Sequence, residues 1–265
     1  MTNIGQTPNL GSLFQTAHEE GDLSARSLQA LNVPAVGMQL QAGLGLPALN
    51  IPSSELVLAA LLIDDSGSIS GARNTDLVID GHNLVIDSLL GSKQKSSIMF
   101  SSRYLNGFIL NPWCLLENGQ RMDRQNFNPR GGTPLYEQTI VHLGSVLAKA
   151  FEAKQNGQLA RTISLIVTDG ADTASRKLAL DVKSVVQDLL MAETHIVAAM
   201  GVDDGYTDFR QVFRDMGIED QWILLPGNTE SEIRHAFQTF SSSAVRASQN
   251  AASFSQTAAG GFGTP

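Results

Sequence analysis

Short apolar runs alternate along this chain with longer segments whose apolar residues recur at helical spacing. The run ELVLAALLI at 55–63 is followed by residues 72–90, in which the apolar positions share one face of a helix. This succession predicts a strand followed by a helix, and it recurs as far as residue 247. We expect further strands at 96–101, 108–116, 161–168, 195–200 and 222–225, and further helices at 134–153, 175–192, 207–216 and 230–247.

The predicted strands are mostly continuous apolar runs with no polar alternation, which indicates burial on both faces of a sheet. A parallel sheet covered by helices on each side produces this pattern. We therefore predict an α/β fold over residues 55–247: a doubly wound, mostly parallel six-stranded sheet. A barrel of eight strand–helix units would need more strands than the chain offers.

Two segments lie outside this predicted domain. Residues 1–54 contain two short helix candidates, 9–19 and 22–32, and then a stretch rich in Gly and Pro that indicates turns and one short strand. We expect them to form an arm packed on the main domain. Residues 248–265 are rich in Ser, Ala and Gly, bury little apolar surface, and are predicted to form a flexible tail, with a docking role left open.

Composition narrows the classes of function. Acidic residues outnumber basic ones by 26 to 18, giving a net charge of −8, and no Lys/Arg cluster is present, which disfavours nucleic acid as the main ligand. No apolar run approaches the roughly 18 residues of a membrane span, so we expect no membrane insertion. One cysteine, Cys114, and no apparent secretory signal make a cytoplasmic location the expectation.

Polar residues cluster at three places that the predicted fold brings to one edge of the sheet. These site loops are residues 64–68 (the first), 130–134 (the second) and 168–172 (the third). In an open parallel sheet the ligand crevice lies beyond the carboxyl ends of the strands. Each loop alone has a structural explanation, since Ser, Asp and Gly form turns and Thr133 before Pro134 suits a helix N-cap. Their joint occurrence favours a functional site.

The three loops offer a set of hard oxygen ligands. Asp64, Ser66 and Ser68 stand two residues apart, so an extended chain can present all three to one side; Thr133 adds a hydroxyl and Asp169 a carboxylate. Oxygen ligands without sulfur or imidazole suit Mg²⁺ or Mn²⁺ better than Zn²⁺ or copper. Because Mg²⁺ prefers six ligands, a position is left for an outside group.

The ordered set Asp64-x-Ser66-x-Ser68, then Thr133 within GGT, then Asp169 within TDG, resembles the metal-ion-dependent adhesion site (MIDAS) of von Willebrand factor A-type (vWA) domains. The resemblance implies that Ser66 and Ser68 bind the ion directly and Thr133 directly or through water. Asp64 and Asp169 would act mostly through water. An Asp or Glu of a partner protein would complete the coordination.

The resemblance covers about residues 55–247 and implies a sheet whose third strand is antiparallel at one edge. In its single cysteine and apparent lack of a signal, the chain resembles intracellular bacterial members of the family, including those associated with tellurite resistance. Asp65 and Asp172 lie outside the five-residue pattern. They could tune the charge or hydrogen-bond coordinated water, but solvated loop residues are the simpler interpretation. Arg130 could steer an acidic partner or be an ordinary surface charge.

Our main hypothesis is a non-enzymatic, Mg²⁺-dependent protein-interaction module. No nucleophile elbow or phosphate loop is present, and none of the five histidines has a partner at ligand spacing. Two alternatives stay open: a metal-dependent phosphohydrolase, and a scaffold that binds through its arm and tail. The segment 201–209 carries three aspartates at the same edge and is predicted to be a turn and helix cap, with partner recognition as the alternative.

Overall fold

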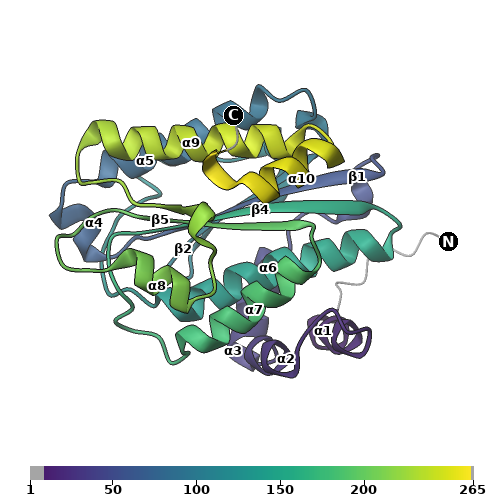
Figure 1. The fold of residues 1–265 in the computed structure, drawn as a ribbon. Coiled ribbons are helices and arrows are strands. Elements are labelled where there is room, and N and C mark those ends of the chain that lie inside the picture. The colour runs from purple at the N-terminus through teal and green to yellow at the C-terminus, as the bar shows by residue number, and fades with distance from the viewer. Residues whose placement is uncertain (1–8, 264–265) are drawn as a thin grey trace.

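The computed structural model describes residues 9–263, so the first eight residues of the predicted arm and the last two of the predicted tail lie outside it. A six-stranded sheet in the order β3-β2-β1-β4-β5-β6 forms the centre of the molecule (Figure 1). The strands are β1 (Glu55–Ile63), β2 (Ile98–Tyr104), β3 (Ile109–Leu115), β4 (Leu159–Thr168), β5 (His195–Gly201) and β6 (Ile223–Leu224). All neighbouring pairs are parallel except β2 and β3, which pair antiparallel at one edge. The predicted fold class is confirmed.

Helices cover both faces of the sheet (Figure 1). The central domain contains α4 (Gly67–Gly71), α5 (Thr75–Leu90), α6 (Leu135–Gln155), α7 (Ala179–Met191), α8 (Phe209–Asp215) and α9 (Glu230–Ser248). Short 3₁₀ turns are η1 (Ala48–Asn50), η2 (Lys95–Ser97), η3 (Leu116–Asn118), η4 (Asp220–Trp222) and η5 (Gly261–Gly263). Helices α5 and α9 pack together on one face, and α6 and α7 on the other. Within residues 9–263, no helix combines the length and apolar character needed to cross a bilayer.

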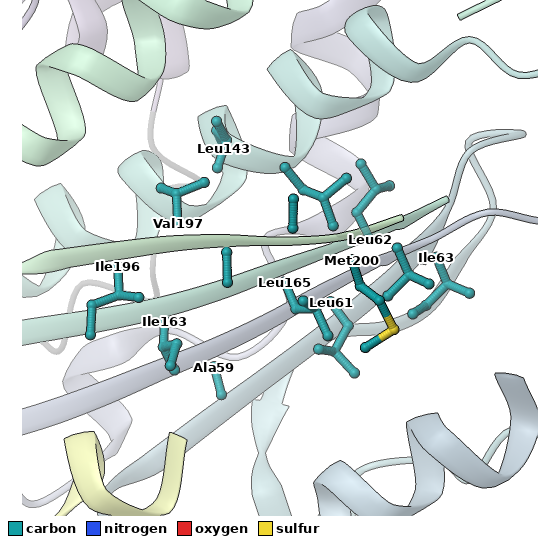
Figure 2. Packing of buried hydrophobic residues seen from close by; sticks show 14 of the residues in the cluster. Ala59, Leu61, Leu62, Ile63, Leu143, Ile163, Leu165, Ile196, Val197 and Met200 are labelled. Carbon is teal, nitrogen blue, oxygen red and sulfur yellow. The ribbon is translucent and has the colours of Figure 1, made fainter. Parts of the chain in front are cut away.

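The sheet is buried on both faces, as its apolar strands predicted. Every residue of β1 after Glu55 is buried. Figure 2 shows Val197 of β5 facing Leu143 of α6, whereas Ile163 of β4 and Ala59 of β1 point to the opposite side. Because both faces are packed, the strands and the positions of their carboxyl ends are fixed relative to one another.

The arm forms three helices that lie against α6 and α7: α1 (Leu10–Glu19), α2 (Ala25–Leu31) and α3 (Pro34–Gly43). The first two match the helix candidates. The third is a correction, because we predicted turns and a short strand there. Pro34 occupies the first turn of α3, where its missing N–H costs nothing, and Val36 and Leu40 bury one face of the helix.

The C-terminal segment also departs from expectation, since residues predicted to form a flexible tail make helix α10 (Ala251–Gly260). The Asn250 side chain caps its start, and Phe254 is buried. Phe262 packs edge-on against Trp222, with the ring centroids 4.9 Å apart. Composition alone underestimates how much apolar surface this segment buries. Two aromatic side chains packed against α9 and η4 provide the burial that the small residues cannot.

Candidate metal centre

The first and third site loops leave neighbouring strands at the same edge of the sheet. Strands β1 and β4 pair in parallel with Ile63 beside Val167, and the backbone N–H of Asp64 donates to the Val167 carbonyl at 2.9 Å. Asp64 and Asp169 both follow the ends of these strands closely. The register of the sheet therefore brings the two carboxylates to one place, as the sequence predicted.

The second site loop is held between the other two by backbone contacts. Gly67 of the first loop donates its N–H to the Gly131 carbonyl at 3.1 Å. On the other side, the Thr133 N–H donates to Thr173 Oγ1 at 3.0 Å, and the Thr173 N–H donates to the Thr133 carbonyl at 2.9 Å. Gly131 has a φ of 96°, a conformation that glycine adopts far more easily than other residues. All three loops thus converge.

Oxygen atoms from the first and third loops are in direct contact. Ser66 Oγ lies 2.8 Å from Ser68 Oγ, and Ser68 Oγ donates to Asp169 Oδ1 at 2.6 Å. Ser66 and Asp169 are 2% and 3% exposed, whereas Ser68 faces solvent. The result is a continuous chain of two hydroxyls and one carboxylate that opens to the surface at Ser68.

Thr133 brings a further hydroxyl to this cluster. Its Oγ1 lies 3.8 Å from where a Cβ on Gly170 would stand, next to Asp169. Within residues 9–263, no hydrogen bond is formed by this hydroxyl, although Thr133 is only 5% exposed. A hydroxyl so placed is available to bind a ligand.

Asp64 holds the first loop in shape. It is fully buried, and both carboxylate oxygens are used: Oδ1 accepts from the Ser66 N–H at 2.7 Å and Oδ2 accepts from Thr168 Oγ1 at 2.6 Å. Thr168 was missed by the sequence interpretation. Its signal was its position as the last residue of β4, beside β1 and directly before Asp169.

The local electrostatics favour a bound cation. The pKa of Asp169 is raised to about 6, mainly by burial and also by the nearby Asp64 carboxylate, while the hydrogen bond from Ser68 acts in the opposite direction. In residues 9–263, no group of three or more His, Cys, Asp or Glu side chains is arranged to hold a metal, so an ion here would depend on the hydroxyls as well as the two carboxylates. This hard oxygen set is chemically suited to Mg²⁺ or Mn²⁺.

Asp65 is not the solvated loop residue that we favoured. It is 2% exposed, and its carboxylate accepts a hydrogen bond of 3.0 Å from the Asn106 N–H in the turn between β2 and β3. Burial raises its pKa to about 6. Asp65 therefore ties the hairpin turn to the first site loop.

Asp172 is also committed within the fold. Its carboxylate accepts from the Tyr136 N–H at 3.2 Å and from Ser175 Oγ at 2.5 Å. Ser175 Oγ in turn accepts from the Glu137 N–H at 2.9 Å. These bonds satisfy free N–H groups in the first turn of α6, so Asp172 caps that helix from a distance.

The alternative explanation of Thr133, as the N-cap of this helix, is wrong. Helix α6 begins at Leu135, Pro134 is the capping residue, and no side chain from that position bonds the first turn. Because Asp172 and Ser175 perform the capping, the Thr133 hydroxyl is not needed for it.

The aspartates of segment 201–209 form the predicted turn and helix cap. Asp204 accepts from the backbone N–H groups of Tyr206 and Thr207 at 2.9 and 2.7 Å. Asp208 caps α8 by accepting from the Gln211 N–H at 3.0 Å. This loop borders the candidate metal centre beyond β5 and raises the pKa of Asp169 slightly through Asp204.

No protein-family model matches this chain, and a comparison with curated proteins also found no match. Among solved structures, it resembles the pilus adhesin SpaC from Lactobacillus rhamnosus GG, with a TM-score of 0.53 and 14% identity over 72% of this chain and 30% of SpaC. It also resembles proximal thread matrix protein 1 from the mussel byssus, described with a zinc-occupied MIDAS motif, with a TM-score of 0.51 and 14% identity over 72% of this chain and 46% of that protein.

The chain thus spans less than half the length of these two structures. At this identity the likeness shows the fold alone. Together with the strand order and the antiparallel edge strand, it confirms the expected doubly wound, mostly parallel α/β architecture.

Proposed function

We propose that this chain is a non-enzymatic, divalent-cation-dependent protein-binding module. Mg²⁺ or Mn²⁺ is held by Asp64, Ser66, Ser68, Thr133 and Asp169, and an Asp or Glu of a partner protein completes its coordination. One observation carries the proposal: the Ser68 hydroxyl meets the Asp169 carboxylate 101 residues away, while Thr133 presents a hydroxyl without a hydrogen-bond partner within the described residues beside them.

The ligand set accounts for the preference for an acidic partner. When bound, the ion supplies positive charge that attracts a carboxylate oxygen. Three of the five ligands are neutral hydroxyls, so Asp64 and Asp169 do not overcompensate that charge. Asp64 orients the first loop through Ser66, and Ser68 remains exposed to an incoming group.

Exposed apolar side chains at the same edge support a protein as the partner. Phe108 in the β2–β3 turn is 51% exposed, Leu178 before α7 is 62% exposed, and Tyr206 in the β5–α8 loop is 97% exposed. Aromatic side chains such as Phe108 and Tyr206 are enriched at protein interfaces, and Leu178 adds apolar surface beside them.

Calorimetric titration with Mg²⁺ tests the metal site. We expect Ser68→Ala and Thr133→Val to weaken Mg²⁺ binding by about tenfold or more, since each loses one ligand oxygen. Ser70→Ala is the matched control, because Ser70 is another exposed serine of α4 and bonds only the Gly67 carbonyl. No binding by the wild type, or equal binding by Ser68→Ala and Ser70→Ala, would contradict the proposal.

Capture experiments from the native host test the partner. We expect proteins captured in Mg²⁺ to be released by EDTA, lost with Ser68→Ala and retained with Ser70→Ala. Capture that survives EDTA but is lost on removal of residues 1–54 or 248–265 would favour the scaffold alternative instead. Turnover of a generic phosphoester that disappears in Asp64→Ala would favour the phosphohydrolase. The cytoplasmic location and the likeness to intracellular bacterial members stay predictions from the sequence.

A further inference from the structure

Three exposed arginines flank the candidate metal centre, one beside each site loop. Arg73 lies just after α4, which continues the first loop; Arg130 opens the second loop; and Arg176 lies between the third loop and α7. Among residues 9–263, none of these three guanidinium groups has a carboxylate within 4.0 Å. The charges surround an ion site in a chain whose net charge is −8.

Exposed arginines elsewhere behave differently. Six of them have side chains that are 41–74% exposed, and each forms an ion pair. They are Arg26, Arg121, Arg124, Arg210, Arg214 and Arg234. With 26 acidic residues in the chain, an exposed guanidinium group readily finds an internal partner. Among residues 9–263, the absence of an ion pair within 4.0 Å at all three site loops is therefore a local feature of this edge, although Arg130 is near enough to Asp65 to lower the pKa of that carboxyl.

The backbone conformation of Arg73 is a second observation that sets this arginine apart. Its φ is 62°, in the left-handed region that Gly or Asn adopts more easily. Two hydrogen bonds of the next residue, Asn74, hold this conformation. Its backbone N–H donates to the Ile69 carbonyl at 2.9 Å, and its Nδ2 donates to Asn228 Oδ1 at 2.8 Å. An arginine is thus held in a backbone conformation that glycine would adopt at a lower cost in free energy.

The backbones of the other two arginines are also fixed by hydrogen bonds. The Arg130 N–H donates to the Asp65 carbonyl at 2.6 Å, and the Arg176 N–H donates to Glu137 Oε2 at 3.3 Å. Their backbones are fixed while their side chains remain exposed, which lowers the entropic cost of pairing with an outside anion.

Negative charge limits the direction in which an acidic partner can lie. The loop between β5 and α8 carries Asp203, Asp204 and Asp208, and it borders the site on the side of β5. The three arginines belong to loops on the side of β1, β4 and α6. An acidic segment is therefore attracted toward α4 and the start of α6, and repelled from the β5–α8 loop.

We infer that the partner segment is acidic beyond the single carboxylate that reaches the ion, with further Asp or Glu side chains that pair with Arg73, Arg130 and Arg176. This inference rests on the proposed function, which it deepens by naming the chemistry of the partner. Guanidinium groups bind carboxylates through paired N–H donors, and arginine is enriched among the residues that dominate binding energy at interfaces.

Fluorescence anisotropy with two labelled peptides of equal length tests the inference. One peptide carries a single Glu among Ser and Gly residues, and the other carries additional Glu residues on both sides of it. In Mg²⁺ we expect the wild type to prefer the Glu-rich peptide by about tenfold or more. The variant Arg73→Gln/Arg130→Gln/Arg176→Gln should lose this preference.

The control of equal charge is Lys93→Gln/Lys95→Gln/Lys154→Gln, in which Lys154 also loses its ion pairs with Glu20 and Asp22. It removes the same charge at the α5–β2 connection and the end of α6, both at the opposite edge of the sheet. We expect it to keep the preference, and circular dichroism should show both variants folded. Equal binding of the two peptides by the wild type overturns the inference, as does a preference that survives in the arginine variant or is lost equally in the lysine variant.

The same titrations in EDTA separate this inference from the proposed function. If the single-Glu peptide binds the wild type equally in Mg²⁺ and in EDTA, the metal-dependent function fails. The arginine inference is measured separately, by the difference in affinity between the two peptides. If Mg²⁺ binds in calorimetry but neither peptide binds in Mg²⁺, the inference about the partner is overturned while the metal site stands.

Discussion

Asp64 and Asp65 are adjacent in the sequence and serve different parts of the molecule. Asp64 bonds Ser66 and Thr168, whereas Asp65 bonds the turn at Asn106. Successive side chains of extended backbone point to opposite sides, so two neighbouring carboxylates cannot easily share one task. Only Asp64 is bonded to the other residues of the candidate metal centre.

We predict that Asp65→Asn leaves Mg²⁺ binding close to that of the wild type, because the amide oxygen can still accept from the Asn106 N–H and no ion ligand is removed. Asp65→Ala should lower the free energy of unfolding by about 1 kcal/mol, since the turn then loses this hydrogen bond. Calorimetry and urea denaturation measure the two effects. A loss of Mg²⁺ binding in Asp65→Asn as large as that in Ser68→Ala would make Asp65 a ligand.

At the scale of elements, the packing of α5 on α9 depends on a close approach at one glycine. A Cβ added to Gly81 would stand 2.3 Å from the ring of Phe237, which is fully buried. By contrast, a Cβ added to Gly37 of α3 would meet nothing within 4 Å. Both glycines lie inside helices. Comparing an alanine substitution at each position therefore separates the effect of packing on stability from the effect of helix propensity.

We predict that Gly81→Ala lowers the free energy of unfolding by about 1–3 kcal/mol, because overpacking outweighs the better propensity of alanine. Gly37→Ala should raise it by about 0.5–1 kcal/mol, because propensity acts there alone. Urea denaturation of the two variants provides the comparison. A Gly81→Ala protein as stable as Gly37→Ala would show that α5 and α9 do not approach as described.

At the scale of the whole molecule, helices from both ends of the chain pack over the central domain, and two of the histidines, His82 and His195, are buried. Burial lowers the pKa of His82 and of His195 to about 4 in each case. His195 shares a 2.7 Å hydrogen bond between Nδ1 and Thr162 Oγ1. The folded protein therefore resists protonation at these positions, whereas the unfolded chain takes up protons near the ordinary histidine pKa of about 6.5.

We predict that His195 makes the protein less stable as pH falls from 6.5 toward 4. In this window the unfolded state binds a proton that the folded state does not, which costs about 2 kcal/mol of stability at pH 5. Urea denaturation at pH 7 and about pH 5 should show a smaller loss for His195→Asn than for the wild type. The difference between the two proteins cancels the other titrating groups, so an equal loss would contradict the prediction.

Periodicity and residue order along the chain were enough to predict the succession of strands and helices and the order of the candidate oxygen ligands. Hydrophobic periodicity is a local property, and runs such as 55–63 become strands because their apolar side chains need burial on both faces. The parallel arrangement then brings Asp64 and Asp169 to one edge without further information. The candidate metal-ligand pattern could be recognised because it depends on the spacing of residues and on their positions after the strands, both of which are visible along the chain.

The roles of Asp65, Asp172 and Thr133, and the helix at residues 251–260, depend on contacts that form when distant parts of the chain pack together. Asp65 meets Asn106 across 41 residues, and Asp172 meets Tyr136 across 36. Phe254 is buried only because α9 lies beside its helix. Such bonds and contacts join segments far apart in sequence, so their free energy depends on the packed fold and leaves no periodic signal in the chain.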